Sequence, residues 1–146
     1  MEIALRALSP GVNDPFTAIT CVDHLASALS RLATRDMPLP YRYDSTDQLR
    51  VIAPGSTFAE VTDVAFNQIR QNARSSAAVT LRLLETIAVV MRFAHRSGDR
   101  AALLRHAEMI ARGARGGLSE GADRQVVEDR YQSVIRLCSE SSGSSH

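Results

Sequence analysis

The chain contains no lysine and no tryptophan, and it has few aromatic residues of any kind. Without lysine, neither Schiff-base catalysis nor a P-loop lysine for nucleotide binding is available. Aromatic residues make up 5% of the chain, too few to predict stacking platforms for single-stranded nucleic acid. All 17 basic residues are arginines, yet the net charge is only +1, so no overall field attracts nucleic acid or acidic substrates.

Cysteine is also scarce, with only Cys21 and Cys138 in 146 residues. Two cysteines so far apart form neither a disulfide framework nor a zinc site, and we expect both to be reduced and buried, as in cytoplasmic proteins. The histidines lack the His-His or Glu-x-x-His spacing of a helical metal site, and His106 and Glu108 do not share a helical face. The sequence therefore predicts no metal, no cofactor and no catalytic residue.

Long uncharged apolar runs are absent as well. The most apolar stretch, residues 77–94, contains Arg82, Glu85 and Arg92, whereas a membrane-spanning helix needs ~20 mostly uncharged apolar residues. No signal peptide is visible. We therefore expect this stretch to be a buried helix of a soluble domain, at its centre or at an oligomer interface.

What the chain does have is helical periodicity, because apolar residues recur every three or four positions in six segments. The predicted helices cover residues 2–8, 15–34, 57–72, 77–95, 100–114 and 122–138. Asp14 before Pro15, and Thr57 with Glu60, are typical helix-start signals. The predicted inner stripes include Phe16 on the second helix and Val64 on the third.

Residues 36–54 have a different character, because two short β-prone segments flank the polar residues 44–47. We expect a small β-hairpin at about 40–53, which must pack on the helices or pair with something else, since a lone hairpin is marginally stable. Residues 139–146 form a predicted disordered tail. The predicted fold class is all-α, an antiparallel helical bundle of about five to six helices with one hairpin insert, in a single domain over 1–138.

The turn-rich segment Ser9–Pro15 is the most distinctive feature of the chain. Gly11 and Asn13 tolerate positive φ, and the first amides of the following helix can bind an anion or a carboxylate. The candidate ligand-binding residues are Ser9, Gly11, Asn13, Asp14, Thr17 and Thr20. The alternative is a rigid corner between two helices, in which Ser9 and Asp14 act only as caps.

Arginines offer a second candidate surface. Arg42, Arg50, Arg70 and Arg74 are interpreted as a solvated face, or as contacts to anionic lipid head groups if this side lies against a bilayer. The basic run at residues 112–117 is typical of a helix C-terminus rather than of an RNA-binding motif.

The segment Ala4–Ala18 (ALRALSPGVNDPFTA), followed by Cys21-Val22-Asp23, resembles the hallmark of a bacterial family of predicted membrane proteins, domain of unknown function 2254. Residues 50–54, 65–70 and 81–85 resemble it too, and the resemblance covers about residues 2–137. It implies several membrane-spanning helices followed by a soluble region, whose C-terminal part corresponds to this chain. It implies no activity and no catalytic residues.

Three functions follow as hypotheses. The first is a regulatory or assembly domain on the cytoplasmic side of an inner-membrane protein, packing against itself, the membrane region or another partner, close to the membrane without spanning it. The second is a small-ligand or anion-binding domain that uses the Ser9–Thr17 corner. The third is an enzyme in which His24, Asp14 or Asp23 converges with residues of distant helices.

Overall fold

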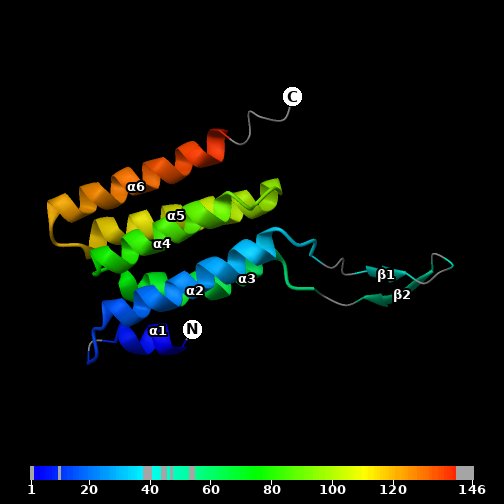
Figure 1. Cartoon of the computed structure of the whole chain (residues 1–146), viewed down its shortest axis with the longest axis horizontal. Coiled ribbons are helices and arrows are strands. Elements are labelled where there is room, and N and C mark those ends of the chain that lie inside the picture. Colours follow the sequence, from blue (N-terminus) through cyan, green and yellow to red (C-terminus); the bar gives the residue numbers. More distant parts are fainter. Residues whose placement is uncertain are drawn as a thin grey trace.

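The computed structural model describes residues 2–9, 11–37, 41–43, 46, 48–52 and 55–140 (Figure 1). Within these residues the helices are α1 (Glu2–Ala7), α2 (Pro15–Ala33), α3 (Phe58–Ala73), α4 (Ala77–Met91), α5 (Ser97–Gly117) and α6 (Gly121–Glu140). The class is all-α, as the sequence predicts. None of the helices in the described part of the chain is long and apolar enough to cross a membrane.

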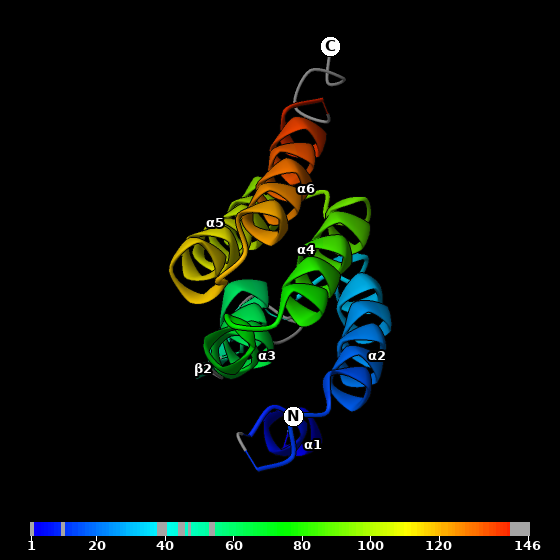
Figure 2. The ribbon, with the colours of Figure 1, turned by 90° about the vertical axis from the view of Figure 1, so that its left-hand side faces the viewer.

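Helix α4 lies at the centre of the fold, between α2 on one side and α5 and α6 on the other (Figure 2). Six of its apolar side chains are almost completely buried: Val79, Leu83, Leu84, Ile87, Val90 and Met91. The prediction that the most apolar segment forms a central helix is therefore confirmed. Helix α4 ends at Met91 rather than near residue 95. Beyond this end, Arg100 donates hydrogen bonds of 3.1 Å to the carbonyls of Met91 and Ala94.

The predicted helix starts are present. Asp14 accepts hydrogen bonds from two amides of the first turn of α2, with Pro15 as the first helical residue. At the start of α3, Glu60 accepts a hydrogen bond from the Thr57 amide at 2.8 Å, while Thr57 Oγ1 accepts one from the Glu60 amide at 3.2 Å. Each pair satisfies amides that a helix leaves without an internal partner.

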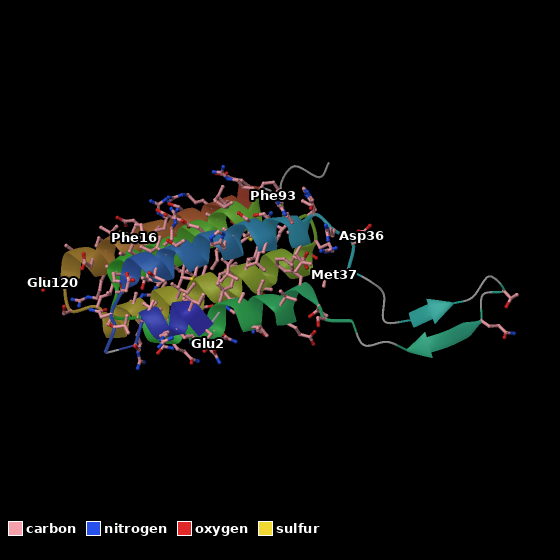
Figure 3. The ribbon with its side chains drawn as sticks, turned by 60° about the horizontal axis from the view of Figure 1, so that its bottom comes forward. Glu2, Phe16, Asp36, Met37, Phe93 and Glu120 are labelled. Carbon is pink, nitrogen blue, oxygen red and sulfur yellow. The ribbon has the colours of Figure 1, made fainter. Side chains whose placement is uncertain are left out.

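Two predicted inward residues point outward instead. Phe16 is 77% exposed and Val64 is 71% exposed. Figure 3 labels Phe16 on the outer side of α2. On α2 the small residues Ala18 and Ala33 turn inward with Val22, so the buried stripe is rotated away from Phe16. Apolar side chains alone do not fix the rotation of a helix when alanines allow closer packing.

Helix α5 is longer than predicted, because it begins at Ser97 rather than 100 and ends at Gly117 rather than 114. Asp99 lies in the first turn, where a carboxylate is stabilised by the helix dipole, and it pairs with Arg96 at 2.7 Å. Gly117 remains helical because it packs tightly on the α3–α4 turn: a Cβ atom there would lie 2.4 Å from the Arg74 carbonyl oxygen.

The predicted insert at about 40–53 lies partly outside the described residues. Of its described part, β1 (Tyr41–Tyr43) and β2 (Leu49–Ile52) pair antiparallel, with Tyr41 opposite Ile52. In Figure 1 the strands extend away from the helices, so the first predicted alternative, packing on the helices, does not hold for these residues, and the second, pairing with something else, stays a prediction. The predicted tail begins later than expected, since α6 includes residues 139 and 140, and residues 141–146 lie outside the described part.

We expect Gly117→Ala to lower the free energy of unfolding by about 1–3 kcal/mol, because the added methyl group meets rigid backbone. The matched control is Gly116→Ala, where no atom lies within 4 Å of the new Cβ. That change should raise stability by about 0.5–1 kcal/mol through helix propensity. Urea unfolding followed by circular dichroism measures both. An equal gain for both variants would show that α5 does not approach the turn this closely.

Candidate functional site

The Ser9–Thr20 corner is a compact turn between α1 and α2. Ser9 Oγ donates a hydrogen bond to the Arg6 carbonyl at 2.8 Å, and the Ser9 carbonyl accepts from the Asn13 amide at 2.9 Å. The Asp14 amide then reaches back to the Ala7 carbonyl at 2.6 Å. Asn13 has φ 43°, whereas Gly11 has no positive φ, so Asn13 alone of the two adopts the predicted left-handed conformation.

Asp14 occupies the helix amides that were predicted to bind an anion. Its Oδ1 accepts from the Phe16 and Thr17 amides, both at 3.1 Å, and its Oδ2 accepts from Thr17 Oγ1 at 2.6 Å. The hydrogen bond from the Thr17 side chain is the main cause that lowers the pKa of Asp14. Thr20 Oγ1 donates to the Phe16 carbonyl at 3.1 Å. Ligand binding by these residues stays a prediction, but most of their polar groups already serve the corner itself.

Asn13 also lines a polar hollow of about 770 Å³ that the sequence does not reveal. Gln71, Asn72 and Arg74 contribute to it from the C-terminal end of α3, and Ser75 follows them in the turn. The end of α5 closes the far side through Gly116 and Gly117. The hollow is therefore lined by three segments that are distant in sequence. A local sequence motif cannot predict such a site.

Arginines gather beside this hollow. Arg70 is partly buried, and its pKa is lowered first by that burial and then by the positive charge of Arg112; Arg105 adds a smaller effect in the same direction. Asp63 pairs with Arg105 at 2.6 Å. The prediction of a solvated arginine face therefore needs a correction at Arg70. Packing of α3 on α5 partly buries Arg70 and brings it close to arginines of α5. The side chains of Arg42 and Arg50 lie outside the described structure.

His106 is fully buried against Phe66, with ring centroids 5.3 Å apart, and its Nε2 lies 2.9 Å from Asp63 Oδ1. Burial lowers the pKa of His106 to about 4, although the nearby carboxylate opposes the shift. Sequence reasoning missed this residue. The sequence signal that could have predicted its burial was that His106 directly precedes Ala107, a residue on the inner side of α5.

Asp23 belongs to a chain of ion pairs across three helices. The Arg82 guanidinium on α4 donates to both Asp23 carboxylate oxygens on α2, at 2.6 and 2.9 Å, and to Glu85 at 3.1 Å. Arg130 on α6 reaches Glu85 at 3.3 Å. These hydrogen bonds from Arg82 lower the pKa of Asp23. Asp23 thus links helices, and within the described residues no three His, Cys, Asp or Glu side chains gather as a metal site would require.

An apolar groove of about 450 Å³ runs between α2 and α3. Its apolar lining is Leu25, Ala28, Leu29, Leu32, Val61, Val64 and Ala65, with Ser56 and Glu60 as its polar members. The outward position of Val64 is explained by this groove, since its side chain lines the gap rather than the core. Nothing among the described residues covers the groove enough to bury Val64.

The comparisons with known proteins find one family model and several uncharacterized relatives. The family model described as "Predicted membrane protein (DUF2254)" matches residues 1–89. Uncharacterized proteins of Mycobacterium bovis and of Mycobacterium tuberculosis strain H37Rv are each 34% identical over 127 residues, which is 87% of this chain. The match covers only 24% of each relative. No solved structure matches the chain.

We expect stability to fall as the pH decreases from 6.5 toward 4, because the unfolded chain protonates His106 in this range while the folded chain does not. Above pH 6.5 the residue is neutral in both states and contributes no pH dependence. The loss is at most about 3 kcal/mol, since each pKa unit corresponds to about 1.4 kcal/mol. Urea unfolding across this range measures it.

His106→Gln should flatten this decline, because the replacement has no group that titrates. The matched control is His24→Gln, which removes an exposed histidine of α2 and should leave the decline unchanged. The lowered pKa values of Asp14, Asp23 and Glu128 contribute from about pH 5 downward, as the carboxyls of the unfolded chain protonate, so the decline between pH 6.5 and about 5 reports on His106. An undiminished decline in His106→Gln would show that another group causes it.

Proposed function

The chain belongs to the DUF2254 family of predicted membrane proteins, and from this premise we propose that it is an assembly or regulatory domain of a bacterial integral membrane protein. The relatives it matches have no assigned function. A non-catalytic role is part of the proposal. His106, the histidine that lies beside a carboxylate, supports it because a side chain without exposed surface cannot reach a substrate.

The observation that carries the proposal is the apolar groove between α2 and α3. Exposed apolar surface that is concentrated in a hollow favours association with another apolar element. Leu25 and Leu32 of α2 face Val61 and Val64 of α3 across it, which matches the surface that the apolar side of a helix buries.

We commit to one occupant, a helix from the same longer protein. The chain spans 24% of the length of the curated relatives that it matches, so most of each relative is available to supply such a helix. Helix α1 supports this choice, because it packs on both α2 and α3. Its N-terminal end points toward the C-terminal half of α2 (Figure 1), the half that contributes Leu25 and Leu32 to the groove.

The insert at about 40–53 belongs to the same proposal. A two-stranded sheet is not stable by itself in water, so the small hairpin needs a partner beyond the described helices. It connects α2 to α3, whose facing sides line the groove. The membrane region of the longer protein is the partner that we propose for it.

The cytoplasmic side of the inner membrane is the proposed location. Basic extramembrane segments are favoured on that side, and the anionic leaflet there attracts arginines. Arg70 and Arg112 supply such charge.

A second candidate function is the binding of a small anion, which the polar hollow at Arg74 favours. An enzyme built on His24, Asp14 and Asp23 has less support. Asp14 holds the start of α2, and Asp23 is paired with Arg82.

The groove can be tested by thiol labelling of Val64→Cys in a background with Cys21 and Cys138 replaced by alanine. In the isolated 146-residue chain the new thiol should react quickly with a maleimide, because position 64 is 71% exposed. In the full-length gene product, assayed in native membranes, we expect labelling at least about tenfold slower, as for a side chain under a helix. The matched control, Val126→Cys on α6, is 51% exposed and should react at similar rates in both.

Equal rates for Val64→Cys in both settings would contradict an occupied groove. If the isolated chain is protected too, and only at high protein concentration, the occupant is a second copy of the chain, which contradicts the proposed helix.

The location can be tested by fusing a reporter to the C-terminus of the full-length gene product in a bacterial host. We expect a green fluorescent protein fusion to fluoresce and an alkaline phosphatase fusion to be inactive, because the phosphatase requires disulfides formed outside the cytoplasm. Active phosphatase with a dark fluorescent fusion would place the domain on the opposite side of the membrane.

A further inference from the structure

We propose that the polar hollow at the meeting point of the α1–α2 corner, the α3–α4 turn and the end of α5 binds a phosphate group. Arg74 and Asn13 both line this hollow, and Arg70 and Arg112 lie on the adjoining helices. The proposal deepens the second candidate function, anion binding, and rests on it; because the site is separate from the α2–α3 groove, it does not depend on the proposed assembly role.

The first step is charge. Arg70 and Arg74 are one helical turn apart on α3, and Arg112 acts on Arg70 from α5. Gly116, one turn beyond Arg112 on the same face of α5, lines the hollow itself. Of the three arginines, Arg74 lines the hollow, whereas Arg70 donates hydrogen bonds to Asn67 Oδ1 at 3.2 and 3.0 Å. The positive charges of Arg70 and Arg112 add to the local potential that an anion beside Arg74 would meet.

The second step is the lack of internal partners. Across the described part of the chain, no hydrogen bond or ion pair engages the side chains of Arg74, Arg112, Asn13 or Gln71. Arg105, by contrast, is paired with Asp63. Asp14, the sequence neighbour of Asn13, has both carboxylate oxygens engaged at the start of α2, so it does not serve Arg74 as an acid partner.

The third step is the match to phosphate. A guanidinium presents a planar fork of N–H donors that contacts two phosphate oxygens at once. The side-chain amides of Asn13 and Gln71, and the hydroxyl of Ser75, add neutral donors around the same space. Asn13 is held in its left-handed conformation by the corner, which fixes its position in the lining before any ligand binds.

The hollow is lined mainly at the C-terminal ends of α3 and α5, and the partial negative charge of those ends disfavours an anion. The charge of the arginines must outweigh this effect for a phosphate group to bind.

The test titrates the isolated 146-residue chain with inorganic phosphate by calorimetry, and sediments it with vesicles of phosphatidylglycerol mixed into phosphatidylcholine. We expect Arg74→Gln to weaken binding about tenfold or more, since hydrogen bonds to a charged group contribute about 1.5–3 kcal/mol. Asn13→Asp should weaken it similarly, because it places a negative charge in the hollow without removing a residue type that tolerates positive φ. The matched control, Arg92→Gln, changes an exposed arginine at the end of α4 and should have little effect.

The two probes separate the sources of the phosphate group. Arg74-dependent binding of inorganic phosphate supports a soluble phosphate ligand, and Arg74-dependent binding of anionic vesicles alone supports a lipid head group. Binding of neither probe overturns the proposal. So does binding that Arg74→Gln leaves intact, or that Arg92→Gln weakens equally, since the latter indicates only a general attraction to basic surface. Circular dichroism of each variant confirms that the fold is retained, and none of these results changes the labelling test at Val64.

Discussion

The burial of α4 on nearly all sides is the constraint on which the rest of the structure depends. A helix that is apolar around its circumference must be surrounded, and here α2 lies on one side while α5 and α6 lie on the other. Helix α3 packs chiefly against α5 and also contacts α4, α1 and α2. The corner at Ser9–Pro15 then folds α1 back onto α2 and α3.

The groove follows from how α2 and α3 are connected and covered. A long insert joins them, so they are not drawn together as α3 and α4 are by their short turn. Helix α1 covers only part of their length, since its 6 residues match about one third of the 19 residues of α2. In the uncovered part, Leu25 and Leu32 pack against the core but leave part of their apolar surface open to the groove.

Periodicity and capping residues predict the helices well because both act locally. Asp14 and Thr57 bind amides within three residues, so their role is visible in the sequence. The rotation of α2, the burial of His106 and the hollow around Arg74 depend instead on which helices are neighbours. Asn13 illustrates both cases. Its left-handed conformation is predictable from the local turn, whereas its position in the same hollow as Arg74 is not predictable from the sequence.

The use of arginine elsewhere in the chain gives Arg74 its significance. Arg100 donates to carbonyls at the ends of both α4 and α6, and Arg124 donates to the carbonyls of Leu118 and Ser119, so these guanidinium groups hold helix ends in place. Exposed arginines such as Arg92 lack internal partners because water solvates them. Arg74 is exposed too, but it also lines a hollow built by three segments and lies one turn from the partly buried Arg70. That placement, rather than a lack of solvent, is the reason for proposing a phosphate site at Arg74.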